Sequence, residues 1–335
     1  MSWAIGLIVG TGLVTAVFLV VLAVIAHRFT TPRRQPSAST VPRSPRGCQN
    51  ISLQARVDGV RLAAWYAPVP DAIGAVVFVH GRDAWRGDVL RGELAPLLDA
   101  FHQRQLNVLM IDLRGHGESA AARLTFGSHE SRDVLAAIDY LKQCGFSLAS
   151  IGLLGASMGG AAAIVAAAQE PRLGAVVTDS TYADLHHVLR LQFRRLTRLP
   201  PCFLSGALLA ARVLTGVSML QSAPAVHIAG RRGQATLVIH AADDPFVPVS
   251  HAHALAASAE CQLWITAGRK HLSSYGVEGR VYLETVATFF SRHLQAPVAC
   301  ATMREDCARR PEPPVACATL RDDFVRRPEP QVSMS

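Results

Sequence analysis

One serine in this chain has the surroundings of a nucleophile. The segment LLGASMGGAAA places Ser157 between Gly155 and Gly159, directly after an apolar run and directly before an alanine-rich one. A strand that ends at Ala156 and a helix that begins at Met158 leave the serine on the sharp turn between them, where small neighbours relieve crowding. A glycine-rich packing turn and a phosphate-binding loop are the other interpretations, but the G-x-G-x-x-G spacing of a dinucleotide fold is absent.

A serine hydroxyl attacks a carbonyl only when a base takes its proton, and that base is usually a histidine oriented by a carboxylate. Asp244 follows the predicted strand ATLVIH within AADDPFVP, and His271 follows the predicted strand QLWIT within AGRKHLSSY. The order along the chain is therefore Ser, Asp, His. Asp243 competes with its neighbour for the acidic role. Asp179, which ends the preceding strand, is a further candidate, although capping a helix or anchoring a loop is the simpler role for it.

The elements that must position these residues alternate along the chain. Asp58-Gly59 joins two β-branched runs into a predicted hairpin. The further predicted strands are Ala75–His80, Leu106–Asp112, Ile151–Ala156, Ala175–Asp179, Thr236–His240 and Gln262–Thr266. Helical patterns lie between them, near 92–104, 128–143, 158–169, 249–258 and 276–294. This alternation predicts an α/β fold with a mostly parallel sheet covered on both faces, and ligands of such sheets bind at the carboxyl ends of the strands.

Three further motifs make the chain resemble the α/β-hydrolase superfamily over about residues 51–294. VVFVHGRD (76–83) resembles the oxyanion strand and loop, and IDLRGHGES (111–119) resembles the next strand with its D-x-R-G-H-G-x-S turn. FGSHESRDVLAAIDYLK (126–142) resembles the helix that follows in the prolyl-oligopeptidase-like and monoacylglycerol-lipase-like branches. We expect the histidines of the first two motifs, His80 and His116, to hold loops by hydrogen bonding.

The resemblance implies a role for each candidate residue. Ser157 would be the nucleophile, His271 the base and Asp244 the orienting acid, in the D-x-x-V-P register that the superfamily shows at its acid. The backbone N–H groups of Arg82 and Met158 would form the oxyanion hole. The sequence departs from the superfamily here, because HG is followed by Arg82-Asp83 instead of glycines. No cofactor or metal is expected.

The N-terminal residues predict a membrane anchor. No charged residue occurs from Ala4 to Ala26, a stretch that spans ~35 Å as a helix. A cleaved signal peptide is the competing interpretation, but the stretch is long for one and no basic residue precedes it. The arginines that follow are Arg28, Arg33, Arg34, Arg43 and Arg46. This positive bias predicts a single-pass membrane protein whose catalytic domain lies in the cytoplasm.

The predicted organisation has four parts. Residues 1–29 form the transmembrane anchor, 30–47 a Pro- and Arg-rich tether, and 48–295 the hydrolase domain. Residues 181–234 interrupt the alternation of strands and helices and are predicted to form a helical cap. Residues 296–335 contain a tandem repeat, PVACATMREDCARRPEP followed by PVACATLRDDFVRRPEP, that cannot bury an apolar face and is predicted to be disordered.

Composition limits the classes of partner. The net charge is +8, but aromatic residues make up only 6% of the chain, which argues against a nucleic-acid partner. In the predicted cap, apolar residues share one helical face, namely Leu185, Val188, Leu189, Phe193 and Leu196. Four arginines lie off this face, so the helix is either a packed lid with solvated arginines or a basic amphipathic element that touches anionic lipid.

These observations predict a serine hydrolase that cleaves an ester, which is lipid-derived on the best interpretation. The expected partners are a small-molecule or lipid ester as substrate and membrane lipid at the N-terminal helix, and the oligomeric state is left open. Two alternatives remain. One is a peptidase or acyltransferase on the same three residues, and the other is a catalytically silent, membrane-tethered interaction protein.

Overall fold

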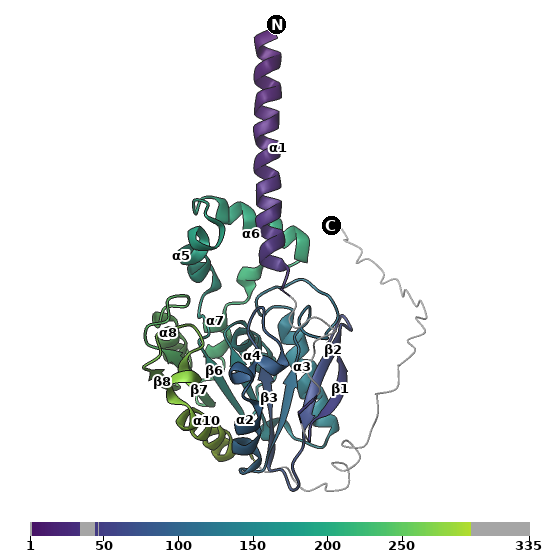
Figure 1. Ribbon diagram of the computed structural model, residues 1–335, viewed down its shortest axis with the longest axis vertical. Helices are drawn as coiled ribbons and strands as arrows, with labels where there is room; N and C mark the ends of the chain where they lie inside the picture. Colours follow the sequence, from purple (N-terminus) through teal and green to yellow (C-terminus); the bar gives the residue numbers. More distant parts are fainter. Residues whose placement is uncertain (1, 34–43, 46, 296–335) are drawn as a thin grey trace, which may run out of the picture.

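The computed structural model describes residues 2–33, 44–45 and 47–295. Its centre is an eight-stranded sheet in the order β1-β2-β4-β3-β5-β6-β7-β8 (Figure 1). The strands are β1 (Gln49–Gln54), β2 (Arg61–Ala67), β3 (Gly74–Val79), β4 (Leu106–Ile111), β5 (Ile151–Ala156), β6 (Ala175–Asp179), β7 (Ala235–Ala241) and β8 (Gln262–Thr266). The pairings β1–β2 and β2–β4 are antiparallel and the others are parallel. The predicted α/β fold is thus confirmed.

Alternation along the central strands sends side chains to two separate cores. In β3, Val77 and Val79 face one core, while Val76 and Phe78 face the other. Both sets are buried because helices cover both faces of the sheet, as expected for parallel strands joined by crossovers. All parallel strands therefore end at one edge of the sheet, and the loops at this edge carry the candidate residues.

The helices divide between the two faces (Figure 1). Helices α3 (Glu130–Gln143) and α4 (Met158–Gln169) contribute to one core, and α2 (Leu94–His102) and α10 (Arg280–His293) contribute to the other. Helix α8 (Ser250–Ala259) packs with α4 in a third, smaller core. The short 3₁₀ helices η1 (Arg86–Gly92) and η2 (Leu148–Ser150) precede α2 and β5.

The predicted helix over 276–294 is two helices in the structure. Helix α9 (Ser274–Glu278) ends at Gly279, whose φ of 53° lies in the left-handed region, and α10 begins at the next residue. Glycine adopts this conformation without the steric cost that a Cβ adds. The break lets α9 lie beside the site while α10 covers the sheet.

Between β6 and β7 the chain forms the helices α5 (Leu185–Thr197), α6 (Phe203–Thr215), η3 (Met219–Gln221) and α7 (Pro224–Ala229). The N-terminal helix α1 (Ser2–Thr30) projects from the domain and passes α6 at its base (Figure 1). This helix is long and apolar enough to cross a membrane, a test that a signal sequence also passes. The predicted C-terminal tail and most of the predicted tether lie outside the described residues.

Candidate active site

Ser157 occupies the sharp turn between β5 and α4. Its backbone has φ 51° and ψ −115°, a conformation that residues with a Cβ rarely adopt and that costs of order 1–3 kcal/mol. Neighbouring backbone groups hold it there. The Ser157 amide donates to the carbonyl of Asp179 at 2.8 Å, and its carbonyl accepts from the amides of Gly160 and Ala161 at 3.0 and 3.2 Å.

The turn closes only because the flanking residues lack side chains. A Cβ on Gly155 would lie 2.5 Å from the Cα of Gly160, so β5 and α4 could not approach as they do. A Cβ on Gly159 would overlap the backbone carbonyls of Val79, the last residue of β3, and of His80 after it. Gly155 and Gly159, which the sequence predicts to flank this nucleophile elbow, thus lie where a bulkier residue would push the helix away from the sheet.

His271 and Asp244 meet Ser157 at the edge of the sheet. The Ser157 Oγ lies 2.9 Å from Nε2 of His271, and Nδ1 of the same ring lies 2.7 Å from Oδ2 of Asp244. Because the carboxylate can only accept, it receives the proton on Nδ1, and Nε2 then accepts from the serine hydroxyl. The structure therefore brings the three predicted residues into one hydrogen-bonded chain.

The other carboxylate oxygen of Asp244 is also occupied. Its Oδ1 accepts from the amides of Phe246 and Val247 at 2.8 and 3.0 Å. Burial raises the pKa of this carboxyl, but the hydrogen bond and charge of His271 and the two amides outweigh burial, so the pKa lies below its ordinary value. Its competitor Asp243 is exposed and lies 3.6 Å from Arg269, so the two adjacent aspartates have different surroundings.

The loop after β3 lies beside the serine. A Cβ on Gly81 would be 3.5 Å from the Cβ of Ser157, so the backbone at this point is in close approach. Within the part of the chain that the structure describes, the backbone amides of Arg82 and Met158 donate no hydrogen bond. Unpaired N–H groups of this kind stabilise an oxyanion when they face it.

His80 and His116 hold this loop, as expected from the sequence. The Nε2 of His80 accepts from the amide of Leu113 at 3.0 Å, and the Nε2 of His116 accepts from the amide of Asp83 at 3.2 Å. Burial lowers the pKa of both imidazoles, to about 3 for His80, so both rings are neutral at pH 7. The Nε2 atom of a neutral ring can accept a hydrogen bond from these amides, and a protonated ring could not.

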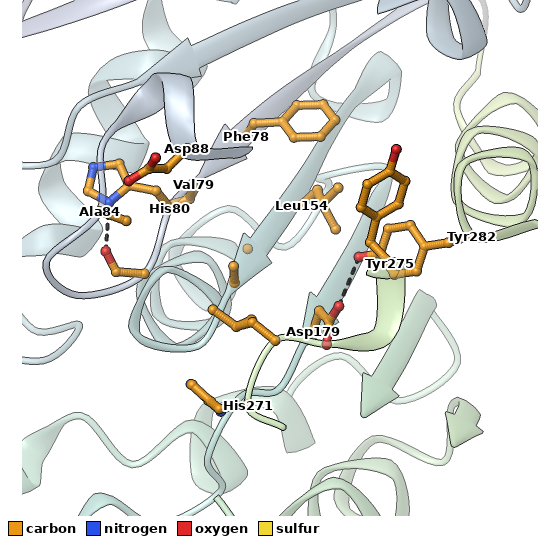
Figure 2. A pocket seen from close by; sticks show the side chains of 14 residues that line it. Phe78, Val79, His80, Ala84, Asp88, Leu154, Asp179, His271, Tyr275 and Tyr282 are labelled. Atoms are coloured by element: carbon orange, nitrogen blue, oxygen red, sulfur yellow. Dashed lines mark hydrogen bonds between the residues drawn. The ribbon is translucent and has the colours of Figure 1, made fainter. Parts of the chain in front are cut away.

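A cavity of about 260 Å³ opens next to His271 between β3, β5 and α9. Figure 2 shows Tyr275 and Tyr282 on one side of the cavity and His80 and Asp88 on the other. Phe78, Val79 and Leu154 are apolar residues among those that line it. An apolar group attached to the reacting carbonyl has room here.

Asp179 lines the same cavity but makes no bond to His271 among the described residues. Its carboxylate accepts from the hydroxyls of Ser180, Ser274 and Tyr282, and the last bond is drawn in Figure 2. Burial raises its pKa. The backbone carbonyl of Asp179 accepts from the amide of Ser157, and its carboxylate accepts from Ser274, which lies three residues after His271. Asp179 therefore connects the serine turn to the histidine loop. Its position at the end of a strand is the sequence signal for this anchoring role.

No group of three or more His, Cys, Asp or Glu side chains in the described ranges has the arrangement of a metal site. The contact between Ser157 Oγ and His271 Nε2 allows nucleophilic attack by a hydroxyl, with an imidazole as proton acceptor.

Part of the sequence matches known proteins. The sequence model of a family described as serine aminopeptidase, S33, matches residues 70–223. The uncharacterized protein YqkD of Bacillus subtilis (strain 168) is 27% identical over 187 residues, which cover 55% of this chain and 61% of YqkD. The uncharacterized protein YfhR of Escherichia coli O157:H7 is 28% identical over 151 residues, covering 42% and 49% of the two chains. The match thus spans half to three-fifths of these relatives.

Solved structures resemble the fold over more of the chain. The Pyrococcus furiosus esterase Pf2001 has a TM-score of 0.62 at 20% identity, and the match covers 79% of this chain and 100% of the esterase. Est1E from Butyrivibrio proteoclasticus, solved with ferulic acid, has a TM-score of 0.53 at 18% identity, with 72% and 98% of the chains covered. The acylaminoacyl peptidase of Pyrococcus horikoshii has a TM-score of 0.56 at 14% identity, with 76% and 42% covered.

The sheet order, the strand-to-helix turn at Ser157 and these likenesses lead to one conclusion. The chain has the α/β-hydrolase fold.

Proposed function

We propose that this chain is a serine hydrolase that cleaves ester bonds through an acyl-enzyme intermediate. Ser157 is the nucleophile, His271 the general base and Asp244 the residue that orients it. The observation that carries this proposal is the hydrogen-bonded chain from Ser157 through His271 to Asp244, with contacts of 2.9 and 2.7 Å. The strained backbone at Ser157 supports it as well, because such strain persists only where the surroundings enforce it.

The reaction proceeds in two steps. As Ser157 Oγ attacks the carbonyl carbon, His271 Nε2 takes the hydroxyl proton, and the carbonyl oxygen becomes an oxyanion held by the amides of Arg82 and Met158. Each such donor is worth about 3 kcal/mol in the transition state. The ionised Asp244 stabilises the imidazolium, which then protonates the departing alcohol. Water, activated by the same imidazole, attacks the acyl-enzyme and releases the acid.

The substrate class that we propose is an ester with an apolar acyl group. Support comes from the apolar lining that Phe78, Val79 and Leu154 give to the cavity beside His271. The likeness to two esterases is consistent with this choice. A lipid-derived ester is the favoured member of the class, because the chain also has a helix long enough to cross a membrane.

Labelling with a fluorophosphonate probe tests the nucleophile. The full-length protein is expected to label, and Ser157→Ala is expected to abolish labelling, because among the described residues no other hydroxyl is hydrogen-bonded to His271 Nε2. Ser147→Ala serves as the matched control. Ser147 is an exposed serine that lies shortly before the start of β5, whereas Ser157 directly follows the end of β5. Full labelling of the Ser157 variant would place the nucleophile elsewhere. A panel of p-nitrophenyl esters of rising chain length then measures acyl preference.

A peptidase or acyltransferase activity on the same residues is the second candidate. The description of the matched family as serine aminopeptidase and the likeness to an acylaminoacyl peptidase favour it. Hydrolysis of aminoacyl p-nitroanilides faster than the corresponding esters would support a peptidase, and transfer to an added alcohol or amine in preference to water would support an acyltransferase. A protein inert in every assay would instead indicate a silent interaction protein.

We also propose that α1 anchors the chain in a membrane with its catalytic domain on the cytoplasmic side. The uncharged stretch from Ala4 to Ala26 and the arginines after it support this orientation. Protease added to spheroplasts is expected to leave the domain intact. Digestion of the domain by the added protease would contradict this orientation and place the domain outside the cytoplasm.

A further inference from the structure

Helix α6 packs along the last three turns of α1. The rings of Phe18 and Phe203 lie 5.2 Å apart, and a Cβ on Gly206 would be 2.7 Å from Leu22. Farther along α1, Phe29 makes an edge contact with Phe193 of α5, with ring centroids 6.2 Å apart. The end of α1 and the helices between β6 and β7 therefore form one packed unit, with α6 beside α1 (Figure 1).

The part of α1 whose side chains are exposed is about as long as a bilayer core is thick. Side chains are exposed or nearly so from Trp3 to Val20, a stretch of 18 residues and therefore ~27 Å. The hydrocarbon core alone is about 30 Å thick, and the interfacial layers bring the total to about 40–45 Å. If α1 spans a membrane, the level at which Phe18 and Leu22 contact α6 must therefore fall at the edge of the core.

The face of α6 that points away from the domain is apolar. Leu209 and Val213 are separated by one helical turn and are 64% and 79% exposed, and Leu214 beside them is 39% exposed. Arg212 is exposed on the same side. A soluble surface rarely shows adjacent, highly exposed aliphatic residues without a partner.

Exposed cations precede α6 in the chain. Arg194, Arg195 and Arg198 stand at the end of α5 and in the turn that leads to α6. Apolar residues in the boundary layer with arginines beside them are typical of helices that lie in the interface of an anionic membrane. The charge and the position beside α1 both select lipid as the occupant of the α6 face.

We propose that the α6 face, formed by Leu209, Val213 and Leu214, lies in the headgroup layer of an anionic bilayer that α1 crosses. The inference rests on the proposed membrane anchor and identifies the source of the substrate as esters dissolved in that bilayer.

Hydrogen bonds connect this unit to both sides of the site. Gln192 of α5 donates to the carbonyls of Pro245 and Phe246, next to Asp244, at 2.9 and 3.0 Å. The Arg82 guanidinium donates to the carbonyl of Arg28 at 3.0 Å, at the end of α1. The loop that contains Asp244 and the loop that contains Arg82 are therefore attached to the elements that meet the bilayer. This attachment brings the mouth of the site close to the lipid surface.

Depth measurements on the full-length chain test the inference. The protein is reconstituted into vesicles of three parts phosphatidylcholine and one part phosphatidylglycerol. A fluorescent non-natural residue replaces Leu209, and in a matched control it replaces Val281, which is 56% exposed on α10. We expect a lipid-borne nitroxide to quench the probe at 209 and aqueous iodide to quench the probe at 281.

The outcomes separate the inference from the anchor. If the protein resists alkaline carbonate extraction but iodide quenches the probe at 209, the inference is overturned and the anchor stands. If carbonate extracts the protein, both fail, while the labelling of Ser157 still tests the hydrolase separately. A probe at 209 that is shielded from both quenchers indicates a second copy or another protein on the α6 face, and this also overturns the inference.

A charge variant tests the functional consequence. Leu209→Asp is expected to lower activity on a long-chain ester held in the vesicles on the order of tenfold, because a leucine side chain is lost from the apolar contact. Activity on a soluble p-nitrophenyl butyrate should stay unchanged, which shows that the domain is folded. Val281→Asp should change neither activity. Equal loss on both substrates, or no loss on the vesicle-held ester, contradicts the proposal.

Discussion

Replacing Asp244 with asparagine tests the arrangement of the site most sharply, because the structure dictates how the new amide must sit. The amides of Phe246 and Val247 both donate to Oδ1. In Asp244→Asn, the side-chain oxygen must stay there to satisfy these two buried donors. The new NH₂ group then takes the position of Oδ2, which lies 2.7 Å from Nδ1 of His271.

This substitution reverses the tautomer of the base. With a donor facing Nδ1, His271 must accept at that nitrogen and carry its proton on Nε2, which faces the Ser157 Oγ at 2.9 Å. The ring can then no longer take the serine proton. A wrong tautomer in an intact Ser-His-Asp site lowers kcat by about 10⁴, or ~5 kcal/mol in the activation free energy. KM should change little, since ground-state binding does not involve this proton.

The assay is the steady-state hydrolysis of the best p-nitrophenyl ester by the full-length protein at pH 7. Asp243→Asn is the matched control, because it makes the same chemical change one residue away on an exposed side chain. We expect it to retain activity within about twofold, as surface substitutions away from special features usually do. A large loss in Asp243→Asn together with an active Asp244→Asn would refute the reasoning.

Two further results are expected. Ser157→Gly should be more stable than Ser157→Ala by about 1 kcal/mol, or ~2–4 °C in Tm, because glycine accepts the positive φ of 51° without strain; equal melting temperatures would contradict the strain argument. Burial lowers the pKa of His80 from 6.5 to about 3, so between these pH values the unfolded chain holds a proton that the folded protein does not. Stability should therefore fall as the pH drops through this window, by up to ~1.4 kcal/mol per pH unit from this residue. His80→Gln, which keeps an acceptor for Leu113, should flatten the slope of urea-derived stability between pH 6 and 4, and an unchanged slope would contradict the assignment.

Most of the fold could be predicted from the sequence because its signals are local. The alternation of apolar strands with helical patterns and the turn at Asp58-Gly59 each depend on a few adjacent residues. The turn at Ser157 also has a local signal, since Gly155 and Gly159 flank the serine within five positions. The break between α9 and α10 was not predicted, because it depends on the backbone conformation of the single residue Gly279.

The details of the site are less local. Asp243 and Asp244 are adjacent residues of the same type, and their sequence surroundings are nearly identical. They differ in the structure because one carboxylate turns inward to His271 and two amides, while the other faces solvent. The three hydroxyls that hold Asp179 come from positions up to 103 residues away, a distance that no local pattern reports.

The sequence by itself determined the element order, the turn that exposes a hydroxyl, and the presence of an apolar N-terminal segment, since each of these follows from residues that are neighbours in the chain. Only the tertiary structure decided which carboxylate meets the imidazole and which face of α1 is covered by α6. The physical reason is that hydrogen bonds and side-chain packing act over a few ångströms, and folding alone determines which distant residues come within that range.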